Sequence, residues 1–364
     1  MRVVVTGASG NVGTALLARL QGSREVSSIV AVGRRPPDPG AGPPVGENPD
    51  GGPPVTWRAA DMGKEPMDDV LAGADALVHL AWRFHPTRDH RQTFADNVVG
   101  SINTFEAAAR QGVKTLVYAS SVGAYSPGPQ TIGQPDEPVD ERWPTHALPT
   151  AAYGRQKSYL ERVLDHLEET AAMRVVRLRS AFVFQRSAAP EQRRIFAGPF
   201  APGRLVASRV LPVVPIPRGM RMQVVAAADV AAAYEAALVR PVSGAFNIAT
   251  DPVLGASELG ELLGARPVTI PPRLARGALA AAFHARLAPT EPGLFELFMS
   301  LPLMDTTRAR TELGWAPTQD AFATFESLLA GLGDPEGGPT PRLAGHAGGP
   351  LRVDELRSGL GARE

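Results

Sequence analysis

The stretch Met1–Gly13 reads MRVVVTGASGNVG, and it decides how the rest of the chain is interpreted. Residues Arg2–Thr6 are rich in β-branched side chains, which is typical of a strand buried on both faces of a parallel sheet. Residues Asn11–Leu20 carry apolar side chains at helical spacing. Because Ser28–Val32 (SIVAV) predicts a second strand, about the first 33 residues form a strand–helix–strand unit of the size that binds a mononucleotide.

Glycines at positions 7, 10 and 13 occupy the junction between the predicted strand and helix. Because glycine has no Cβ, the backbone there can turn sharply and approach a pyrophosphate closely. The start of the following helix adds free N–H groups and the positive end of a dipole. An ordinary strand-to-helix turn is the alternative, but the context of a preceding strand and a following helix favours a dinucleotide-binding loop.

Strands and helices continue to alternate as far as about residue 179. Short apolar runs predict strands, and longer amphipathic runs predict helices. The predicted strands are Val55–Arg58, Ala76–Leu80, Lys114–Ala119 and Arg174–Leu178, and the predicted helices are Thr93–Gln111 and Ala151–Thr170. This order indicates an α/β fold, a Rossmann-type doubly wound parallel sheet with a smaller C-terminal substrate lobe.

The later half of the chain predicts that second lobe, because its elements are short and prolines are frequent there. The strand Gly244–Ala249 is expected to return to the main sheet. The predicted domains are residues 1–181 with about 223–251 for the NAD(P)-binding Rossmann domain, 182–222 with 252–330 for the substrate-binding lobe, and 331–364 for a flexible tail. A stretch rich in proline and glycine, 36–54, predicts a surface insertion.

Composition excludes several classes of function. The chain has 364 residues with 37 Lys and Arg against 37 Asp and Glu, so nothing indicates a nucleic-acid or anionic-membrane partner. The absence of cysteine excludes disulfides, thiol catalysis and cysteine-based metal sites. No apolar run reaches the roughly 18 residues of a membrane-spanning helix, and the N-terminus has no signal-peptide pattern. We expect a cytoplasmic protein with a small-molecule substrate and no metal site.

The residues after the second predicted strand indicate which dinucleotide is bound. An acidic residue there would accept hydrogen bonds from the ribose 2′-hydroxyl of NAD. This chain has Gly33, Arg34 and Arg35 instead, and an arginine can pair with the 2′-phosphate of NADP. We therefore expect NADP, with NAD as the second choice, although these arginines can also be ordinary solvated residues. Asp61 follows the third strand, where it can receive the adenine amino group or cap a helix.

Tyr153 and Lys157 form a candidate pair for proton transfer. They are four residues apart at the start of a predicted helix, so they face the same side. A nearby ammonium favours the phenolate and lowers a tyrosine pKa from its usual value near 10. Ser120 and Ser121 end a predicted parallel strand, at the edge where open α/β sheets bind ligands. Strand-end capping is the alternative for these serines.

Taken together, these segments resemble the extended short-chain dehydrogenase/reductases, in the NAD-dependent epimerase/dehydratase family, over about residues 1–330. The matching pieces, in order, are TGASGNVG (6–13), Asp61, LVHLA (77–81), DNVVGSINTFEAA (96–108), VYASSVGAYS (117–126), YGRQK (153–157), ADVAAA (228–233), FNIA (246–249) and DTTRARTELGWAP (305–317).

The resemblance implies hydride transfer at a hydroxyl- or carbonyl-bearing carbon, by an epimerase, a dehydratase or a reductase. It implies a catalytic group of Ser121, Tyr153, Lys157 and Asn97, with Tyr153 as the acid/base. The cofactor-binding residues that we expect are Gly7, Ser9, Gly10, Asn11, Val12, Gly13, Arg34, Arg35, Asp61, Met62, Leu80, Ala81, Ser120, Tyr153 and Lys157. The family also leads us to expect a homodimer formed through Thr93–Gln111 and Ala151–Thr170.

The chain departs from this family where many members hold a nucleotide-diphosphate sugar. Phe182 stands where those members have an asparagine, and Met222 stands where they have an arginine, with Arg221 adjacent. A diphosphate needs donors that replace its water, so these changes argue against a standard nucleotide sugar. Other arginines can compensate, or they are solvated; they are Arg186, Arg193, Arg194 and Arg204. The aromatic residues Phe182, Phe184, Phe196 and Phe200 indicate a more apolar pocket or simply a core.

Two functional classes remain open on the sequence. One is a catalytic NAD(P)-dependent enzyme, and the other is a non-catalytic NAD(P)-sensing regulatory protein on the same fold. The presence of Ser121, Tyr153 and Lys157 favours catalysis, because function has to be argued from the site.

Overall fold

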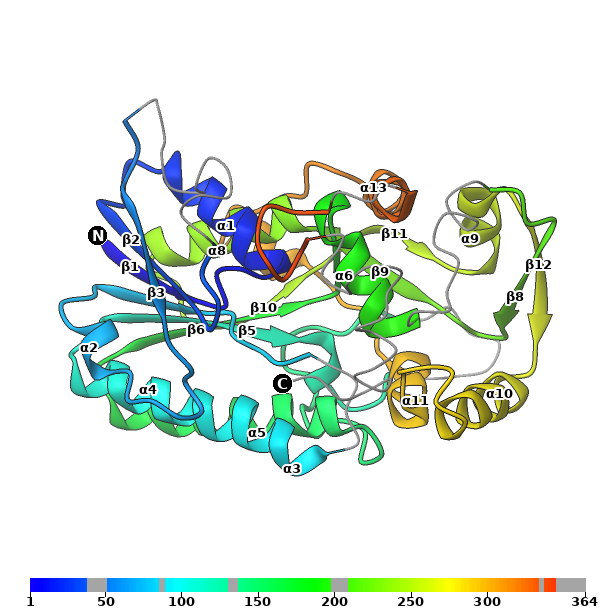
Figure 1. Ribbon diagram of the computed structural model, residues 1–364, viewed down its shortest axis with the longest axis horizontal. Helices are drawn as coiled ribbons and strands as arrows, with labels where there is room; N and C mark the ends of the chain where they lie inside the picture. The colour runs from blue at the N-terminus through cyan, green and yellow to red at the C-terminus, as the bar shows by residue number, and fades with distance from the viewer. Residues whose placement is uncertain (38–50, 85–88, 130–136, 198–208, 334–336, 345–364) are drawn as a thin grey trace.

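A computed structural model of the chain describes residues 1–37, 51–84, 89–129, 137–197, 209–333 and 337–344. Figure 1 shows one large sheet layered between helices, with a smaller lobe beside it. None of the helices in these described ranges combines the length and the apolar character that crossing a bilayer requires.

The central sheet has seven parallel strands among the described residues, in the order β10-β6-β5-β4-β1-β2-β3. The strands are β1 (Arg2–Thr6), β2 (Ser28–Gly33), β3 (Val55–Ala59), β4 (Ala76–His79), β5 (Thr115–Ser121), β6 (Arg174–Ser180) and β10 (Gly244–Ile248). The prediction of a doubly wound parallel sheet is confirmed. The predicted return of Gly244–Ala249 to the sheet is also confirmed, since Phe246 pairs in register with Leu178.

Helices cover both faces of this sheet (Figure 1). The helices α1 (Asn11–Gln21) and α8 (Ala227–Val239) lie on one face, and α2 (Asp68–Leu71), α4 (Gly100–Arg110) and α5 (Ala152–Thr170) lie on the other. Successive side chains of each strand point to opposite faces of the sheet, so the molecule has two separate cores. Val3 and Val5 pack with α1 and α8, whereas Val4 packs with α4 and α5. All three valines are fully buried.

The helix predicted for residues 93–111 is longer and less regular than expected. It begins as α3 (His90–Phe94), passes through a π-helical turn at Ala95–Val99, and continues as α4. A π turn inserts one extra residue into the helical repeat and often lies at a functional site. Here the turn contains Asn97, whose side chain is buried.

The second lobe combines short strands with short helices, as its proline-rich sequence predicts. Its strands are β7 (Phe182–Phe184), β9 (Met222–Ala226) and β11 (Thr250–Leu254) in one sheet, and β8 (Val213–Pro217) and β12 (Arg266–Ile270) in another. Its helices are α6 (Ala189–Gln192), α9 (Ala256–Leu263), α10 (Pro272–His284), α11 (Pro292–Ser300), α12 (Thr307–Thr311) and α13 (Ala321–Gly333). The exact domain boundaries stay a prediction.

One buried carboxylate joins the two parts of the chain. Asp229 at the start of α8 accepts hydrogen bonds from the backbone and hydroxyl of Thr318, at 2.9 and 2.6 Å, and from the backbone of Gln319 at 3.2 Å. Its carbonyl accepts a bond of 2.7 Å from the indole of Trp315. These contacts fix the approach to α13 against the Rossmann layer, because a buried carboxylate is stable only when its oxygens are bonded.

The proline- and glycine-rich stretches are only partly described. Residues 38–50 of the predicted insertion lie outside the described residues, as does most of 331–364. Within the stretch predicted as a flexible tail, residues 331–333 end α13, and residues 337–344 have a defined place against the beginning of α1.

Candidate active site

A cavity of about 1590 Å³ opens at the edge where β1, β4, β5 and β6 end, between the sheet and the second lobe. The structure brings every residue of the predicted site to its wall. These are Gly7, Ser9, Gly10, Asn11, Val12, Gly13, Arg34, Arg35, Asp61, Met62, Leu80, Ala81, Asn97, Ser120, Ser121, Tyr153 and Lys157. Residues up to about 150 positions apart in the sequence therefore contribute to one cavity, as parallel strands that end at one edge require.

Two glycines of the loop, Gly7 and Gly13, approach their neighbours too closely for a side chain. Gly7 has a φ of +71°, and a Cβ there would lie 2.6 Å from the backbone nitrogen of Ala81. A Cβ on Gly13 would lie 2.4 Å from the carbonyl oxygen of Gly7. Gly10 is the N-cap of α1 and has no side chain to bond the free N–H groups of the first turn. The loop therefore fits a pyrophosphate, because it lines the cavity at the start of a helix whose first N–H groups have no side-chain cap.

The end of β2 places Arg34 and Arg35 on the cavity wall, where the adenosine half of a dinucleotide would lie in such a fold. Arg34 forms no hydrogen bond or ion pair with any residue that the structure describes. Asp61 is held by a hydrogen bond of 3.2 Å from the backbone of Gly63, so it caps a turn while also facing the cavity. Both interpretations of Asp61 from the sequence are compatible with this position.

The catalytic candidates meet where β5 ends and α5 begins. Tyr153 packs against the backbone of Gly123, where a Cβ would lie 2.9 Å from the phenol ring. Ser121 accepts a hydrogen bond of 3.0 Å from the Gly123 backbone, which fixes its hydroxyl. Burial raises the pKa of Tyr153 to about 12, although a hydrogen bond with Ser121 lowers it. A phenol in this state is a proton donor, and it needs added positive charge before it can act as a base.

Lys157 is buried one turn further along α5. Its ammonium donates to the Ala119 carbonyl at 2.6 Å and lies 3.7 Å from the centre of the Trp82 ring. Burial lowers the pKa of Lys157 to about 7, while the charge of Glu161 raises it. The lysine therefore changes charge close to neutral pH.

Glu161 belongs to a buried polar network beneath the cavity. Burial favours its neutral form, but hydrogen bonds and charge from Arg179 outweigh that effect and hold the pKa of Glu161 below its usual value. The guanidinium of Arg179 donates to both carboxylate oxygens, at 3.0 and 2.9 Å, and Ser120 donates to one of them at 2.5 Å. The sequence analysis did not single out this pair, because nothing in a strand pattern marks a buried arginine.

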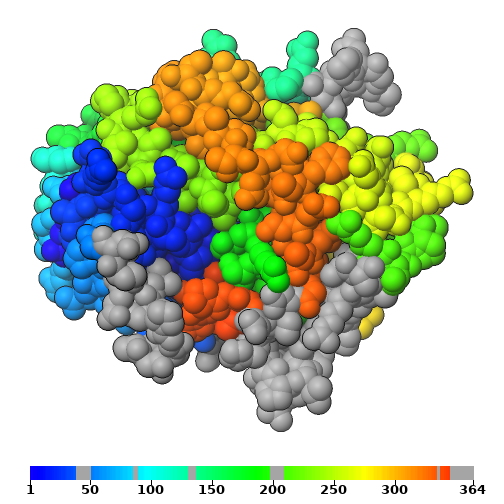
Figure 2. Space-filling view, turned by 90° about the horizontal axis from the view of Figure 1, so that it is seen from above, coloured from blue at the N-terminus to red at the C-terminus, as the bar shows by residue number. Residues whose placement is uncertain are grey.

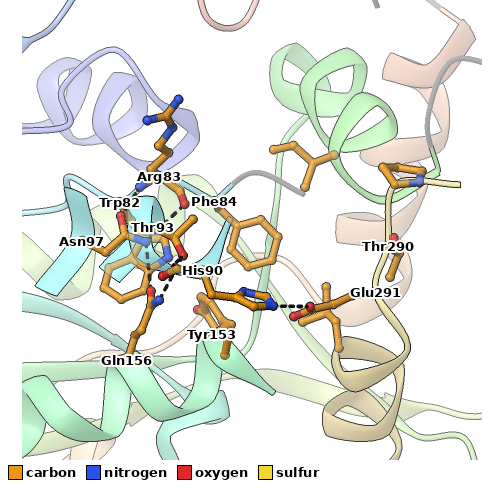
Figure 3. Close-up of a pocket in the computed structure, with 14 residues that line it drawn as sticks. Trp82, Arg83, Phe84, His90, Thr93, Asn97, Tyr153, Gln156, Thr290 and Glu291 are labelled. Atoms are coloured by element: carbon orange, nitrogen blue, oxygen red, sulfur yellow. Dashed lines mark hydrogen bonds and ion pairs between the residues drawn. The ribbon is translucent and has the colours of Figure 1, made fainter. Parts of the chain in front are cut away.

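Asn97 lies beside Tyr153 rather than in contact with the phenol oxygen. Its amide accepts a bond of 2.7 Å from the Arg83 backbone and donates to Gln156 at 3.2 Å; Gln156 in turn donates to Thr93 at 3.1 Å (Figure 3). The amide thus braces α5 against the π turn. The hydrogen bonds of Asn97 therefore connect the segment after β4, the π turn and α5.

Two aromatic residues that follow β4 surround the phenol. The ring centres of Trp82 and Phe84 lie 5.8 and 4.9 Å from that of Tyr153, both in edge-to-face orientation. A smaller cavity of about 60 Å³ lies beside this cluster, and Figure 3 shows His90 and Glu291 pointing toward one another across it, with 3.5 Å between Nε2 and Oε2. The surroundings of the Tyr153 ring are therefore largely aromatic.

The second lobe contributes many apolar residues to the cavity wall, beside the polar residues Glu191, Gln192, Arg193 and Arg194. Phe182, Phe184 and Phe196 line it, and the Phe182 ring lies 5.4 Å from that of Phe298. Other apolar residues on this wall are Met222, Ile195, Leu294, Phe295, Leu297, Leu301, Phe325, Leu328 and Leu332. Arg194 donates to the carbonyls of Arg342 and Ala344, at 2.8 and 3.2 Å. Phe200 and Arg204 lie outside the described residues.

A comparison with protein families finds that residues 3–249 match the model described as NAD dependent epimerase/dehydratase family. Among curated proteins, the chain is 29% identical over 182 residues to uronate dehydrogenase of Pseudomonas putida, which covers 49% of this chain and 59% of that protein. It is 25% identical over 185 residues to L-arabinose 1-dehydrogenase (NAD(P)(+)) of Haloferax volcanii. This alignment covers 49% of this chain and 65% of that protein. The chain thus spans less than two thirds of the length of these relatives.

Solved structures show the same fold. MoeE5 in complex with UDP-glucuronic acid and NAD aligns with a TM-score of 0.66 at 20% identity, over 91% of this chain and 98% of that chain. UDP-glucose 4-epimerase of Thermotoga maritima, with UDP-glucose, aligns with a TM-score of 0.64 at 19% identity. The alignment covers 91% of this chain and 97% of that chain.

The buried lysine leads to a prediction about stability and pH. The pKa of Lys157 is about 10.4 in an unfolded chain and falls to about 7 on folding. Below about pH 7 the lysine is charged in both states, so its burial lowers the free energy of unfolding most there. That cost declines as the pH rises from 7 toward 10. We therefore expect Lys157→Met to raise the melting temperature of the cofactor-free protein more at pH 6 than at pH 9. Melting curves of both proteins in matched buffers measure this, and a difference independent of pH contradicts it.

Proposed function

The chain belongs to the NAD dependent epimerase/dehydratase family, and from that premise we propose that it is an enzyme that transfers hydride at a hydroxyl- or carbonyl-bearing carbon, with Tyr153 as the acid/base. The observation that carries this proposal is the meeting of Ser121, Tyr153 and Lys157 on one cavity wall, beside the glycine loop. A regulatory protein without turnover has no use for this complete set, so catalysis is favoured over NAD(P) sensing.

The proton chemistry follows from the positions of these side chains. When bound, the nicotinamide ring accepts the hydride or returns it. Tyr153 takes the hydroxyl proton as the carbon loses its hydride, so that a carbonyl remains, and it returns the proton in the reverse direction. Ser121 holds the reacting oxygen through its hydroxyl. The positive charges of Lys157 and of an oxidised nicotinamide lower the pKa of Tyr153 from about 12 toward the working pH.

NADP is the cofactor that we propose. Arg34 and Arg35 line the cavity at the end of β2, where an acidic residue would favour NAD. Arg34 is without a hydrogen-bonding partner in the described part of the chain, which leaves its guanidinium available to a phosphate.

We propose a substrate with an apolar body attached to the reacting carbonyl or alcohol carbon, rather than a sugar nucleotide. The phenylalanines that the second lobe places on the cavity wall cannot replace the water around a diphosphate. The donor of Arg194 is already bonded to two carbonyls. The relatives named above as dehydrogenases support net oxidation or reduction over epimerisation.

A homodimer is also proposed, through α3, α4 and α5. Phe94, Val99 and Tyr159 are 42%, 42% and 50% exposed, and the Phe94 and Tyr159 rings lie 6.0 Å apart on neighbouring helices. A second copy of the chain would cover this apolar surface. A cytoplasmic location stays a prediction.

The role of Tyr153 is tested by Tyr153→Phe. The phenyl ring keeps the packing against Gly123, so the dissociation constant for NADPH should change less than about threefold. Turnover should fall by at least about 10²-fold, since a positioned acid/base contributes 10²–10⁴. NADPH oxidation at 340 nm and cofactor titration measure the two effects. Unchanged turnover in this variant would leave the sensing protein as the better explanation.

The substrate class is tested with NADPH and 2-alkanones from butanone to decanone. Each buried methylene contributes about 0.8 kcal/mol, so kcat/KM should rise roughly fourfold per carbon until the cavity is filled. Phe182→Asn should flatten this slope, while Leu274→Asn, at an exposed position on α10, should not. Faster conversion of UDP-glucose than of any alkanone would contradict the proposed class.

The dimer is tested with Tyr159→Glu. A charge at the centre of an apolar interface should shift the molecular mass in solution from dimer to monomer, measured by light scattering after size exclusion. Leu274→Glu is the control, because Leu274 is 66% exposed and lies on α10. A wild-type monomer contradicts the proposal.

A further inference from the structure

A segment far from the family-matched region lies against the glycine loop. The hydroxyl of Thr340 donates to the carbonyl of Ser9 at 2.7 Å. Residues 337–344 form a turn that two backbone hydrogen bonds of 3.0 Å hold together. The Gly338 nitrogen donates to the Leu343 carbonyl, and the Leu343 nitrogen donates to the Thr340 carbonyl. The side chain of Leu343 is fully buried. The segment is therefore a packed turn at the cofactor loop.

The figures show the same juxtaposition. In Figure 1 the orange-red turn lies beside the start of α1 and near α6. Figure 2 shows it on the surface between the blue N-terminal residues and the green residues of the second lobe. Both views thus place this turn beside the start of α1.

Arg342 belongs to this turn, and its positively charged side chain lies on the cavity wall. Its Nε donates to Glu191 of α6, a carboxylate that is only 6% exposed. Its two Nη groups have no hydrogen bond to the residues that the structure describes, and the side chain lines the large cavity. Because the guanidinium is a planar fork, one edge bound by a carboxylate leaves another edge for a second oxyanion. Glu191 thus orients the arginine without using all of its donors.

A second arginine lies within electrostatic range. Burial lowers the pKa of Arg34, the charge of Arg83 lowers it further, Asp61 raises it, and Arg342 lowers it again. Arg83 is paired with Asp96, and Arg342 is paired through Nε alone. Arg34 itself has no ion pair in the described ranges. This corner of the cavity therefore holds excess positive charge that a bound anion would compensate.

We propose that Arg342 is a cofactor-binding residue, and that its guanidinium binds a phosphate group of the dinucleotide together with Arg34. Residues 337–344 would then complete the site that the glycine loop begins. This inference rests on the proposed function only in taking a dinucleotide as the cofactor. The 2′-phosphate of NADP and the pyrophosphate share the recognised chemistry, and the experiment below separates them.

The test is the dissociation constant of NADPH and of NADH, measured by fluorescence titration of the wild-type protein and of Arg342→Gln. Loss of a charge-assisted hydrogen bond should weaken NADPH binding about tenfold or more. If the affinity for NADH falls by the same factor, Arg342 binds the pyrophosphate. If the affinity for NADH does not change, Arg342 binds the 2′-phosphate. Either result supports the proposal. Changes below about twofold for both cofactors overturn it.

A structural effect needs separate variants, because Arg342→Gln leaves the buried Glu191 without its partner. The double variant Glu191→Gln with Arg342→Gln removes that orphaned charge, and its melting temperature without cofactor should return toward that of the wild type. The binding loss should persist in it. Recovery of wild-type affinity in the double variant overturns the proposal. Arg273→Gln, an exposed arginine on α10, is the matched control and should change neither constant.

The outcomes also separate this inference from the proposed function. If the wild-type protein binds neither NADPH nor NADH, the proposed function fails and this inference fails with it. If the wild type binds and Tyr153→Phe abolishes turnover, but the Arg342 variants bind normally, only this inference fails.

Discussion

The constraint on which the site depends is the close approach of the glycine loop to its neighbours. A Cβ at position 13 would lie 2.4 Å from a carbonyl oxygen, and one at position 7 would lie 2.6 Å from the backbone after β4. This packing sets where α1 begins relative to the sheet edge, and α1 in turn is fixed to the second lobe by a bond of 2.8 Å from Asn11 to the Val183 carbonyl. The glycine-loop side of the cavity wall is therefore fixed to both the sheet and the second lobe.

A chain of buried charged residues extends from the sheet to the neighbourhood of Tyr153. Arg179 keeps Glu161 ionised, and the charge of Glu161 in turn favours the protonated form of Lys157. Arg179 also donates to the hydroxyl of Tyr125 at 3.0 Å, and that hydroxyl donates to Asn247 on β10 at 2.7 Å. The charge of Lys157, one helical turn from Tyr153, therefore depends on Glu161 and Arg179. Such a network stabilises only when every member is satisfied.

Much of the fold and of the site was predictable, because both depend on local patterns. Buried parallel strands have apolar runs that local sequence reveals, and strands that end at one edge bring Ser121 and Tyr153 to the same cavity. The π turn at Ala95–Val99 was not predictable, since its extra residue depends on packing around Asn97. The position of Trp82 over Lys157, and that of residues 337–344, arise from contacts between distant segments, which periodicity does not encode.

The Ser9–Thr340 hydrogen bond joins residues 331 positions apart, and this distance has a consequence for how the protein folds. Contacts between remote parts of a chain form slowly, because the loop between them must first be ordered. We expect the parallel sheet to assemble before residues 337–344 dock on the glycine loop. The wall of the cavity beside that loop would then be completed late in folding.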